Sequence, residues 1–355
     1  MQNFIKNIEI ENYKSIKKQN FDCERINLFI GRPNVGKSNL LEALSLLGKH
    51  SGDRFYSDYL NYEEIPNLFY DQNIESIIKI KTDKSLLLLK YFISSNDFAY
   101  ILDFKNLKEP QELIKKVKDS AYFINQYIKD KDLGDKYTIF SFNLKGNIEN
   151  ASDLDAKSNI FSYDFKKNID NKKLSINRLS SPFGENIFEI IVGYQKLRND
   201  LTSYLNHYDL EIVYSFKDQT FHIQKKINGV VYETPYSLLA DTLQRIIFYN
   251  AAIYSNSDSV LIFEEPEVNS FPPYIQELAE NIVDSESNQF FISTHSPYLL
   301  NTIIEKNRKD IGVFIVEYRD HQTIVKKLTE DDISELLDYG TDIFLNIEDF
   351  FENGK

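Results

Sequence analysis

The sequence predicts an α/β fold, and three observations carry that prediction. Residues 31–38 place a glycine-rich turn between an apolar run at 26–30 and a stretch with helical spacing at 40–47, which is the order strand, loop, helix. From residue 241 onward, short apolar runs alternate with helical stretches, as in a parallel sheet covered by helices. Before them, Asn228-Gly229 separates two strand-like segments, the usual sign of an antiparallel hairpin.

The first third of the chain should be rich in strands. Two are expected before the glycine-rich turn, one around Ile5 to Ile10 and one at 26–30. The helix after the turn should end near Gly48, because glycine is a common helix stop. Segments 74–80 and 86–104 have the apolar content of two further strands.

The middle of the chain predicts an insertion. Apolar residues recur at helical spacing from Pro110 to Lys129, and a second helix is expected from Asn186 to Leu205. Residues 144–180 are rich in Asn, Lys, Asp and Ser, which predicts loops. The expected domains are an N-terminal lobe at 1–105, a helical and loop insertion at 106–207, and a C-terminal lobe at 208–355.

The C-terminal lobe alternates between the two kinds of element. Continuous apolar runs predict buried parallel strands, and periodic stretches between them predict helices. After an initial strand at 211–216, the expected order is helix 241–254, strand 259–263, helix 272–283, strand 289–292, helix 297–304 and strand 312–317.

Composition indicates the cellular compartment and limits the classes of binding partner. Of the 355 residues, 42% are hydrophobic, which favours a large buried core over disorder. Lys and Arg number 41 against 54 Asp and Glu, a net charge of −13, which argues against general nucleic-acid binding. The single cysteine, Cys23, excludes an internal disulfide, and no apolar run reaches the roughly 20 residues of a membrane span. We therefore expect a soluble cytoplasmic protein without a membrane partner.

Residues 31–38 form the complete pattern Gly-x-x-x-x-Gly-Lys-Ser. A loop of this kind points successive backbone N–H groups at one anion, and the helix behind it adds its positive N-terminal end. We expect Lys37 to reach the outer phosphates of a nucleotide and the Ser38 hydroxyl to complete a Mg²⁺ shell. The candidate nucleotide-binding residues are Gly31, Arg32, Pro33, Asn34, Val35, Gly36, Lys37, Ser38 and Asn39.

Two carboxylates follow the apolar run at 260–263. In an open α/β sheet, ligands bind at the carboxyl ends of the strands, where Glu264 and Glu265 would lie. We expect Glu264 to hold Mg²⁺ through water, together with Ser38, and Glu265 to polarise an attacking water. The alternative interpretation is an acidic turn that only caps the next helix.

A histidine ends the next buried strand. The segment 291–297 reads Phe-Ile-Ser-Thr-His-Ser-Pro, which places His295 one strand away from the two carboxylates. We expect its imidazole to contact the terminal phosphate, although a lone histidine is often structural. The predicted catalytic residues are Lys37, Glu265 and His295.

These motifs, in this order, resemble ABC-type ATPases of the branch that includes RecF, SMC and OLD proteins. The matching segments are Ile8–Ile16, Asn34–Leu44, Leu179–Ile187, Ile262–Glu267 and Ile292–Pro297. The resemblance implies a P-loop NTPase fold of the ABC head type, with an antiparallel β subdomain and an inserted, mainly helical lobe. It also implies ATP and Mg²⁺ as ligands and an ATP-bound homodimer, with each head closing over the other's nucleotide. No long heptad segment indicates a coiled coil.

The signature segment of that family is altered. In relatives its Ser-Gly-Gly or Ser-Asp-Gly core touches the partner's nucleotide, whereas Ala240, Asp241 and Thr242 stand in its place. Ser237 and Thr242 are the hydroxyl groups that could replace the missing serine. The alteration leaves open a second class of function, a scaffold that binds ATP, dimerises and scarcely hydrolyses it.

Two further classes fit less well. The sequence of the P-loop resembles that of ribosome-associated GTPases, and Asn307–Asp310 loosely resembles their guanine-binding motif. However, the chain contains no Asp-x-x-Gly switch, which a GTPase needs. OLD proteins carry a C-terminal Toprim nuclease domain, and the 60 residues after His295 are too few for one.

The resemblance favours an anti-phage defence role with a separately encoded effector protein, a nuclease or a toxin. DNA repair of the RecF kind is the alternative. DNA contact would depend on basic pairs such as Lys166-Lys167 and Lys172-Lys173, which are more commonly solvated surface.

Overall fold

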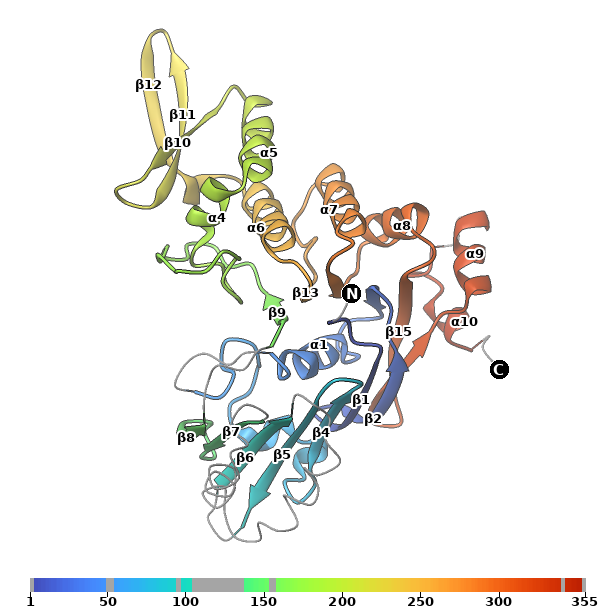
Figure 1. The fold of residues 1–355 in the computed structure, drawn as a ribbon. Helices are drawn as coiled ribbons and strands as arrows, with labels where there is room; N and C mark the ends of the chain where they lie inside the picture. Colours follow the sequence, from blue (N-terminus) through green and yellow to red (C-terminus); the bar gives the residue numbers. More distant parts are fainter. Residues whose placement is uncertain are drawn as a thin grey trace.

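A computed structural model gives the architecture, and strands dominate the described part of the chain (Figure 1). The structure describes residues 3–48, 54–93, 97–103, 137–152, 158–339 and 342–352. Within these ranges the strands form three sheets, and the α/β class predicted from the sequence is confirmed.

An antiparallel sheet is formed by strands that lie between residues 7 and 152 (Figure 1). Among the described residues it has the order β2-β1-β4-β5-β6-β7-β8. Its strands are β1 Asn7–Tyr13, β2 Ile16–Asp22, β4 Ile78–Thr82, β5 Leu86–Phe92, β6 Asp97–Asp103, β7 Tyr137–Phe142 and β8 Ile148–Ser152. The single strand expected at 86–104 is in fact the pair β5 and β6, and β2 was not expected.

A second, mainly parallel sheet carries the sequence motifs. Its order in the described chain is β16-β15-β3-β14-β13-β9, with β16 alone antiparallel to its neighbour. The strands are β3 Ile26–Ile30, β9 Ile160–Tyr163, β13 Val260–Glu264, β14 Gln289–Ser293, β15 Ile311–Arg319 and β16 Gln322–Lys327. Because β3, β13 and β14 are parallel, their carboxyl ends bring three distant motifs to one edge.

Helices cover this sheet on both faces. The α-helices of the described ranges are α1 Lys37–Ser45, α4 Ile187–Gly193, α5 Gln195–Asn206, α6 Asp241–Ser255, α7 Pro272–Asp284, α8 Pro297–Lys306, α9 Glu330–Tyr339 and α10 Ile347–Glu352. Among the described residues, short 3₁₀ helices span Ile65–Leu68, Tyr70–Gln72 and Tyr236–Leu238. In Figure 1, α6, α7 and α8 lie along one side of the sheet, and α1 lies between that sheet and the antiparallel one.

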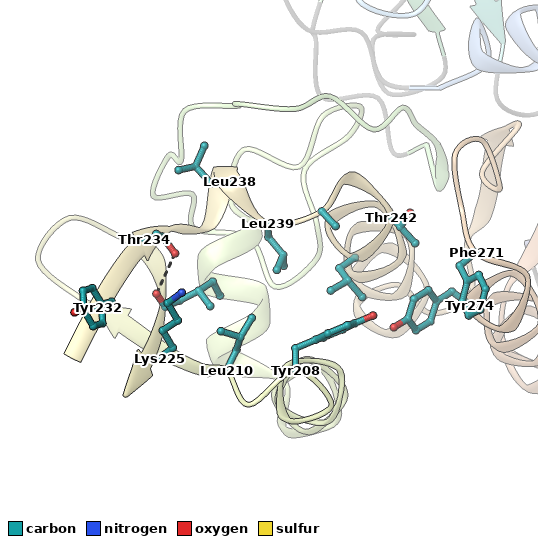
Figure 2. Close-up of a pocket in the computed structure, with 13 residues that line it drawn as sticks. Tyr208, Leu210, Lys225, Tyr232, Thr234, Leu238, Leu239, Thr242, Phe271 and Tyr274 are labelled. Atoms are coloured by element: carbon teal, nitrogen blue, oxygen red, sulfur yellow. Dashed lines mark hydrogen bonds between the residues drawn. The ribbon is translucent and has the colours of Figure 1, made fainter. Parts of the chain in front are cut away.

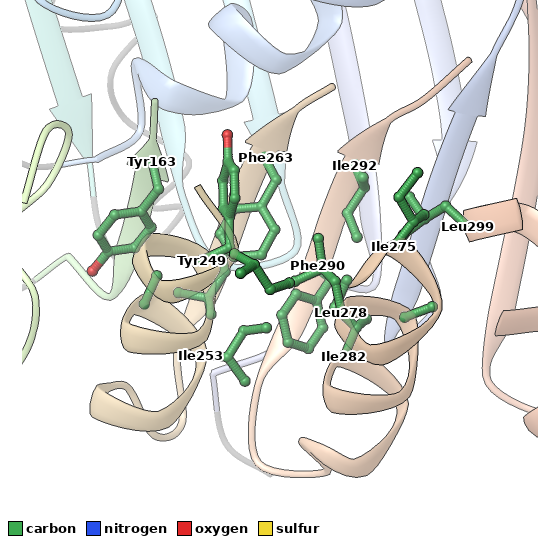
Figure 3. Close-up of a cluster of buried hydrophobic side chains, with 14 of the residues drawn as sticks. Tyr163, Tyr249, Ile253, Phe263, Ile275, Leu278, Ile282, Phe290, Ile292 and Leu299 are labelled. Carbon is green, nitrogen blue, oxygen red and sulfur yellow. The ribbon is translucent and has the colours of Figure 1, made fainter. Parts of the chain in front are cut away.

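Two hydrophobic cores flank the parallel sheet, because side chains alternate along each strand. On β13, Leu261 and Phe263 enter the core formed with α4 to α8, whereas Val260 and Ile262 enter the core around α1. Figure 3 shows the first core, where the Phe263 ring lies 4.9 Å from that of Tyr249, centroid to centroid. This double burial holds the carboxyl edge of the sheet rigid.

A three-stranded sheet projects from the helical side (Figure 1). It consists of β10 Glu211–Ser215, β11 Thr220–Ile227 and β12 Val230–Pro235. The predicted hairpin turn is confirmed, with positive φ at Asn228 (50°) and Gly229 (83°).

Some predictions for the middle of the chain differ from the structure. Loops were expected throughout 144–180, but residues 148–152 form β8 and residues 160–163 form β9. Both strands are short and join sheet edges, where polar residues are tolerated on the outer face. The helix expected at 110–129 lies outside the described residues, and the three domain boundaries stay predictions. No helix in the described ranges is both long and apolar enough to cross a membrane.

Candidate active site

The glycine-rich loop leaves β3 and turns directly into α1. Gly36 has a φ of 102°, in the region that favours glycine, and Asn34 has a φ of 64°. A Cβ atom at Gly36 would lie 2.1 Å from the Thr323 hydroxyl oxygen. Glycine is therefore required here both by the backbone and by the neighbour on β16.

Lys37 folds back across the mouth of this loop. Its Nζ donates hydrogen bonds to the carbonyl oxygens of Gly31 (3.0 Å) and Arg32 (2.9 Å). Burial lowers the pKa of the Lys37 ammonium, while the charges of Glu265, Glu264 and Glu267 oppose that shift. A buried ammonium surrounded by carboxylates suits an anionic ligand that carries bound metal.

Ser38 and Glu264 lie in contact, although 226 residues separate them in the sequence. The Ser38 hydroxyl donates a hydrogen bond to Glu264 Oε1. Glu264 is accessible at the end of β13, but the concave site reduces its hydration and raises its pKa, an effect that the Ser38 hydrogen bond opposes. A hydroxyl and a carboxylate oxygen are the hard donors that Mg²⁺ prefers, so these residues fit the predicted metal.

Glu265 and His295 form the other wall. His295 Nε2 lies 3.3 Å from Glu265 Oε1. Loss of hydration lowers the pKa of the His295 imidazole, as does the nearby charge of Lys37, whereas Glu265 opposes the shift. Glu265 has a φ of 42°, an uncommon conformation for a residue with a long side chain. Backbone strain of this kind concentrates at functional sites.

A cavity of about 700 Å³ connects Lys37, Ser38, Glu265 and His295, whereas Glu264 is not among the residues that line it. Its walls are formed by Ser15, Pro33, Asn34, Gly36, Lys37, Ser38, Asn39, Glu265, His295 and Tyr318. Of the other predicted residues, Gly31 contributes its carbonyl, and Val35 is buried beneath the loop. The Arg32 side chain points elsewhere and pairs with Glu348 at 2.7 Å.

Ser15 and Tyr318 line the cavity but were not predicted as site residues. Ser15 Oγ lies 2.6 Å from the Thr323 hydroxyl and accepts a hydrogen bond from Asn39 Nδ2 at 2.6 Å. Thr323 donates to the carbonyl of Val35 at 2.9 Å. These contacts link the β1–β2 turn, the loop and β16, and no local sequence pattern indicates them.

The altered signature segment lies at the start of α6, with Ala240 as the residue before the helix. Asp241 pairs with Lys167 at 2.6 Å, and the Thr242 hydroxyl donates to the carbonyl of Asn269 at 2.6 Å. The side chains of Asp241 and Thr242, which stand in the place of the family's signature core, thus both have partners within the same chain.

A second cavity, of about 520 Å³, lies beside this segment (Figure 2). Leu238, Leu239 and Thr242 form one wall, and aromatic residues of α7 and the three-stranded sheet form the others. The two cavities have no lining residue in common.

Comparison with known proteins places this site in context. Residues 26–301 match the family described as "AAA domain, putative AbiEii toxin, Type IV TA system". An ATP/GTP phosphatase of Helicobacter pylori is 22% identical over 400 aligned residues, covering 98% of each chain. A DNA replication and repair protein RecF of Caldanaerobacter subterraneus is 33% identical over 93 residues, which is 23% of this chain and 26% of that protein. Among solved structures, an SMC head bound to the C-winged helix domain of ScpA is similar with a TM-score of 0.48 and 12% identity, covering 92% of this chain and 98% of that one.

Proposed function

This chain belongs to that AAA-domain family, and we propose that it is an NTPase of the RecF and SMC-like class that hydrolyses ATP to ADP and phosphate in the P-loop cavity. The observation that carries the proposal is convergence: Lys37, Glu265 and His295, from three separate segments, line one cavity. The phosphatase relative is named for both ATP and GTP. ATP is preferred because the chain lacks the Asp-x-x-Gly switch of GTPases.

The reaction is an in-line attack of water on the γ-phosphate. Lys37, held at the loop mouth, neutralises charge that develops on the phosphate oxygens. Glu265 accepts a hydrogen bond from the attacking water and orients it. His295, beside Glu265, donates to the γ-phosphate and registers its presence.

Magnesium is the implied metal. When bound, it would supply positive charge that offsets the negative charge of the nucleotide phosphates. Ser38 would be a direct ligand, and Glu264 would hold a water of the metal shell; their contact supports this pairing.

Nucleotide binding is proposed to control a homodimer of two heads. Large apolar side chains are exposed where helices start beside the site: Leu238 (72% exposed), Phe271 (59%) and Tyr298 (58%). Helices that alternate with parallel strands start at the carboxyl edge of the sheet, which is the nucleotide edge. Exposed apolar groups gathered on one edge are typical of an interaction surface.

The proposed biological role is defence against phage, with a separately encoded effector. The family description, which names an AbiEii toxin and a Type IV TA system, supports it. The RecF relative supports the alternative role in DNA repair. The neighbouring genes discriminate between them: an adjacent nuclease or toxin gene supports defence, and recombination genes support repair.

A nucleotide-dependent scaffold is the second candidate function. Thr242 is the hydroxyl best placed to replace the missing signature serine, yet it is hydrogen-bonded to Asn269. A head with a weakened contact in trans would dimerise on ATP and turn over slowly.

Phosphate release from ATP and GTP tests the proposal. The wild type should release phosphate faster from ATP, and Lys37→Ala should abolish release. Glu280→Gln is the matched control, because Glu280 is a surface acid on α7 paired with Lys306 at 2.9 Å. Unchanged turnover in Lys37→Ala would exclude this cavity as the site of hydrolysis. ATP-dependent dimers without turnover in the wild type would favour the scaffold.

A further inference from the structure

A third carboxylate follows the two predicted ones and has a different environment. Glu267 is only 7% exposed, whereas Glu264 is exposed and Glu265 is half-buried at the wall of the cavity. Nothing in the sequence pattern distinguishes the three acids, which are three residues apart at most. The structure does, because the turn after β13 directs Glu267 inward, beneath the segment that carries His295.

Glu267 holds that segment through one oxygen. Its Oε1 accepts a hydrogen bond from the Thr294 hydroxyl at 2.6 Å and another from the His295 backbone N–H at 2.9 Å. Hydrogen bonds to an ionised acceptor are about twice as strong as neutral ones. The connection between β14 and α8 is thus fastened to a side chain from the neighbouring strand's loop.

The loop after β13 is in turn hydrogen-bonded to the end of β14. The Glu265 backbone N–H donates to the Ser293 carbonyl at 3.0 Å, in line with the strand pairing that ends at Glu264 and Ser293. Together, these bonds lock the loop after β13 to the loop after β14. The Glu265 carboxylate and the His295 imidazole are therefore held 3.3 Å apart by backbone contacts and by Glu267.

The other oxygen of Glu267 is buried and has no hydrogen-bond partner within the described part of the chain. A buried carboxylate with one unused oxygen is unfavourable for folding, and loss of hydration raises its pKa accordingly. An apolar side chain would leave no unpaired oxygen at this position. A buried carboxylate that destabilises the fold is expected at a functional site, where it contributes to activity rather than to stability.

We propose that Glu267 is a positioning residue, which fixes the His295 segment against Glu265 so that the imidazole and the carboxylate reach the same γ-phosphate and water. Glu267 lines no part of the cavity, so its effect passes through His295. The expected kinetic effect rests on the proposed ATPase function, whereas the contact between Glu267 and the His295 segment does not.

Hydrogen–deuterium exchange tests the contact without nucleotide. In Glu267→Ala, the His295 amide loses its acceptor, and exchange in the 293–297 segment should quicken by about tenfold or more. Glu267→Gln keeps a carbonyl oxygen at that position and should stay within about twofold of wild type. Gln289→Ala is the matched control: Gln289 is a buried polar residue at the other end of β14, bonded to the backbone of Ile5. Equal protection of 293–297 in wild type and Glu267→Ala would overturn the proposal.

A double-mutant cycle tests the kinetic role. Glu267→Ala should lower kcat for ATP about tenfold with KM within about twofold, and Glu267→Gln should restore most of kcat. In a His295→Ala background, Glu267→Ala should have little further effect, because the two act as a unit. Additive losses, or a change in KM alone, would contradict a positioning role through His295. If the wild type released no phosphate, the proposed function would fail, while the exchange result would still decide the contact.

Discussion

His295 Nε2 and Glu265 Oε1 lie 3.3 Å apart at the ends of neighbouring parallel strands. The strand register pairs Glu264 with Ser293, so each of these two residues stands just beyond the last pair. A carboxylate at this distance favours the protonated form of the imidazole. That relationship can be measured directly.

The first prediction concerns the protonation of His295. Its pKa should lie below the ordinary 6.5, because lost hydration and the Lys37 charge both disfavour the imidazolium. The imidazole is then mostly neutral at pH 7. It gains a proton only as the pH falls through this lowered pKa. Lys37→Ala removes a positive neighbour and should raise the pKa, whereas Glu265→Gln removes a negative one and should lower it. A histidine NMR titration measures these shifts, with the other histidine signals as internal reference. Shifts of the opposite sign would refute the arrangement.

Glu265→Gln should separate binding from chemistry. The amide keeps the size of the side chain but cannot polarise water, so turnover should fall by about a hundredfold or more. ATP should still bind, because Lys37 and Ser38 are unchanged. Phosphate release and retention of labelled ATP on a filter measure the two effects. Loss of ATP binding in this variant would assign Glu265 to the binding of nucleotide instead.

Gly36→Ala should destabilise the fold as well as the site. The substitution places a Cβ atom at a φ of 102° and 2.1 Å from Thr323 Oγ1. Gly229→Ala is the matched control, since its φ of 83° is also strained but nothing lies within 4 Å of the new Cβ. We expect a loss of about 1 kcal/mol for Gly229→Ala and about 1–3 kcal/mol more for Gly36→Ala. Urea unfolding measures both. Equal losses would mean that Thr323 moves aside freely.

Leu238→Asp should weaken the proposed dimer. In a Glu265→Gln background with ATP, sedimentation should detect a dimer, and the aspartate should weaken it by at least about tenfold. Ile227→Asp provides the control, because Ile227 is 47% exposed on the projecting three-stranded sheet. If both substitutions weaken the dimer equally, the interface does not lie on the nucleotide edge.

The parallel sheet and its motifs were predictable from the sequence for a physical reason. Strands buried on both faces are continuously apolar, so 260–263 and 289–292 stand out, and the residues after them lie at one edge. The order of those strands was not predictable. β3 lies between β14 and β15 because of pairings across more than 250 residues, which leave no local pattern.

Two strands missed by the sequence prediction, β2 and β16, are half-exposed. β2 reads Ile-Lys-Lys-Gln-Asn-Phe-Asp, and only its first residue and Phe21 are buried. β16 is similarly polar, yet its Thr323 supports the P-loop. Tyr318 faces the cavity from the end of β15, where an exposed tyrosine has no distinguishing context in the sequence. Glu267 was passed over because burial, not residue type, distinguishes it from Glu264 and Glu265.

The place of β3 between β14 and β15 has a consequence for synthesis on the ribosome. Both of its partner strands emerge only after residue 288. At roughly 5–20 residues per second, β3 stays unpaired for on the order of ten seconds or longer. During that interval its four apolar residues, Ile26, Leu28, Phe29 and Ile30, have no sheet to join and are exposed to chaperones. The phosphate-binding loop therefore folds late. A chain released before β14 has been made would contain the P-loop sequence but not the sheet that holds this loop in place.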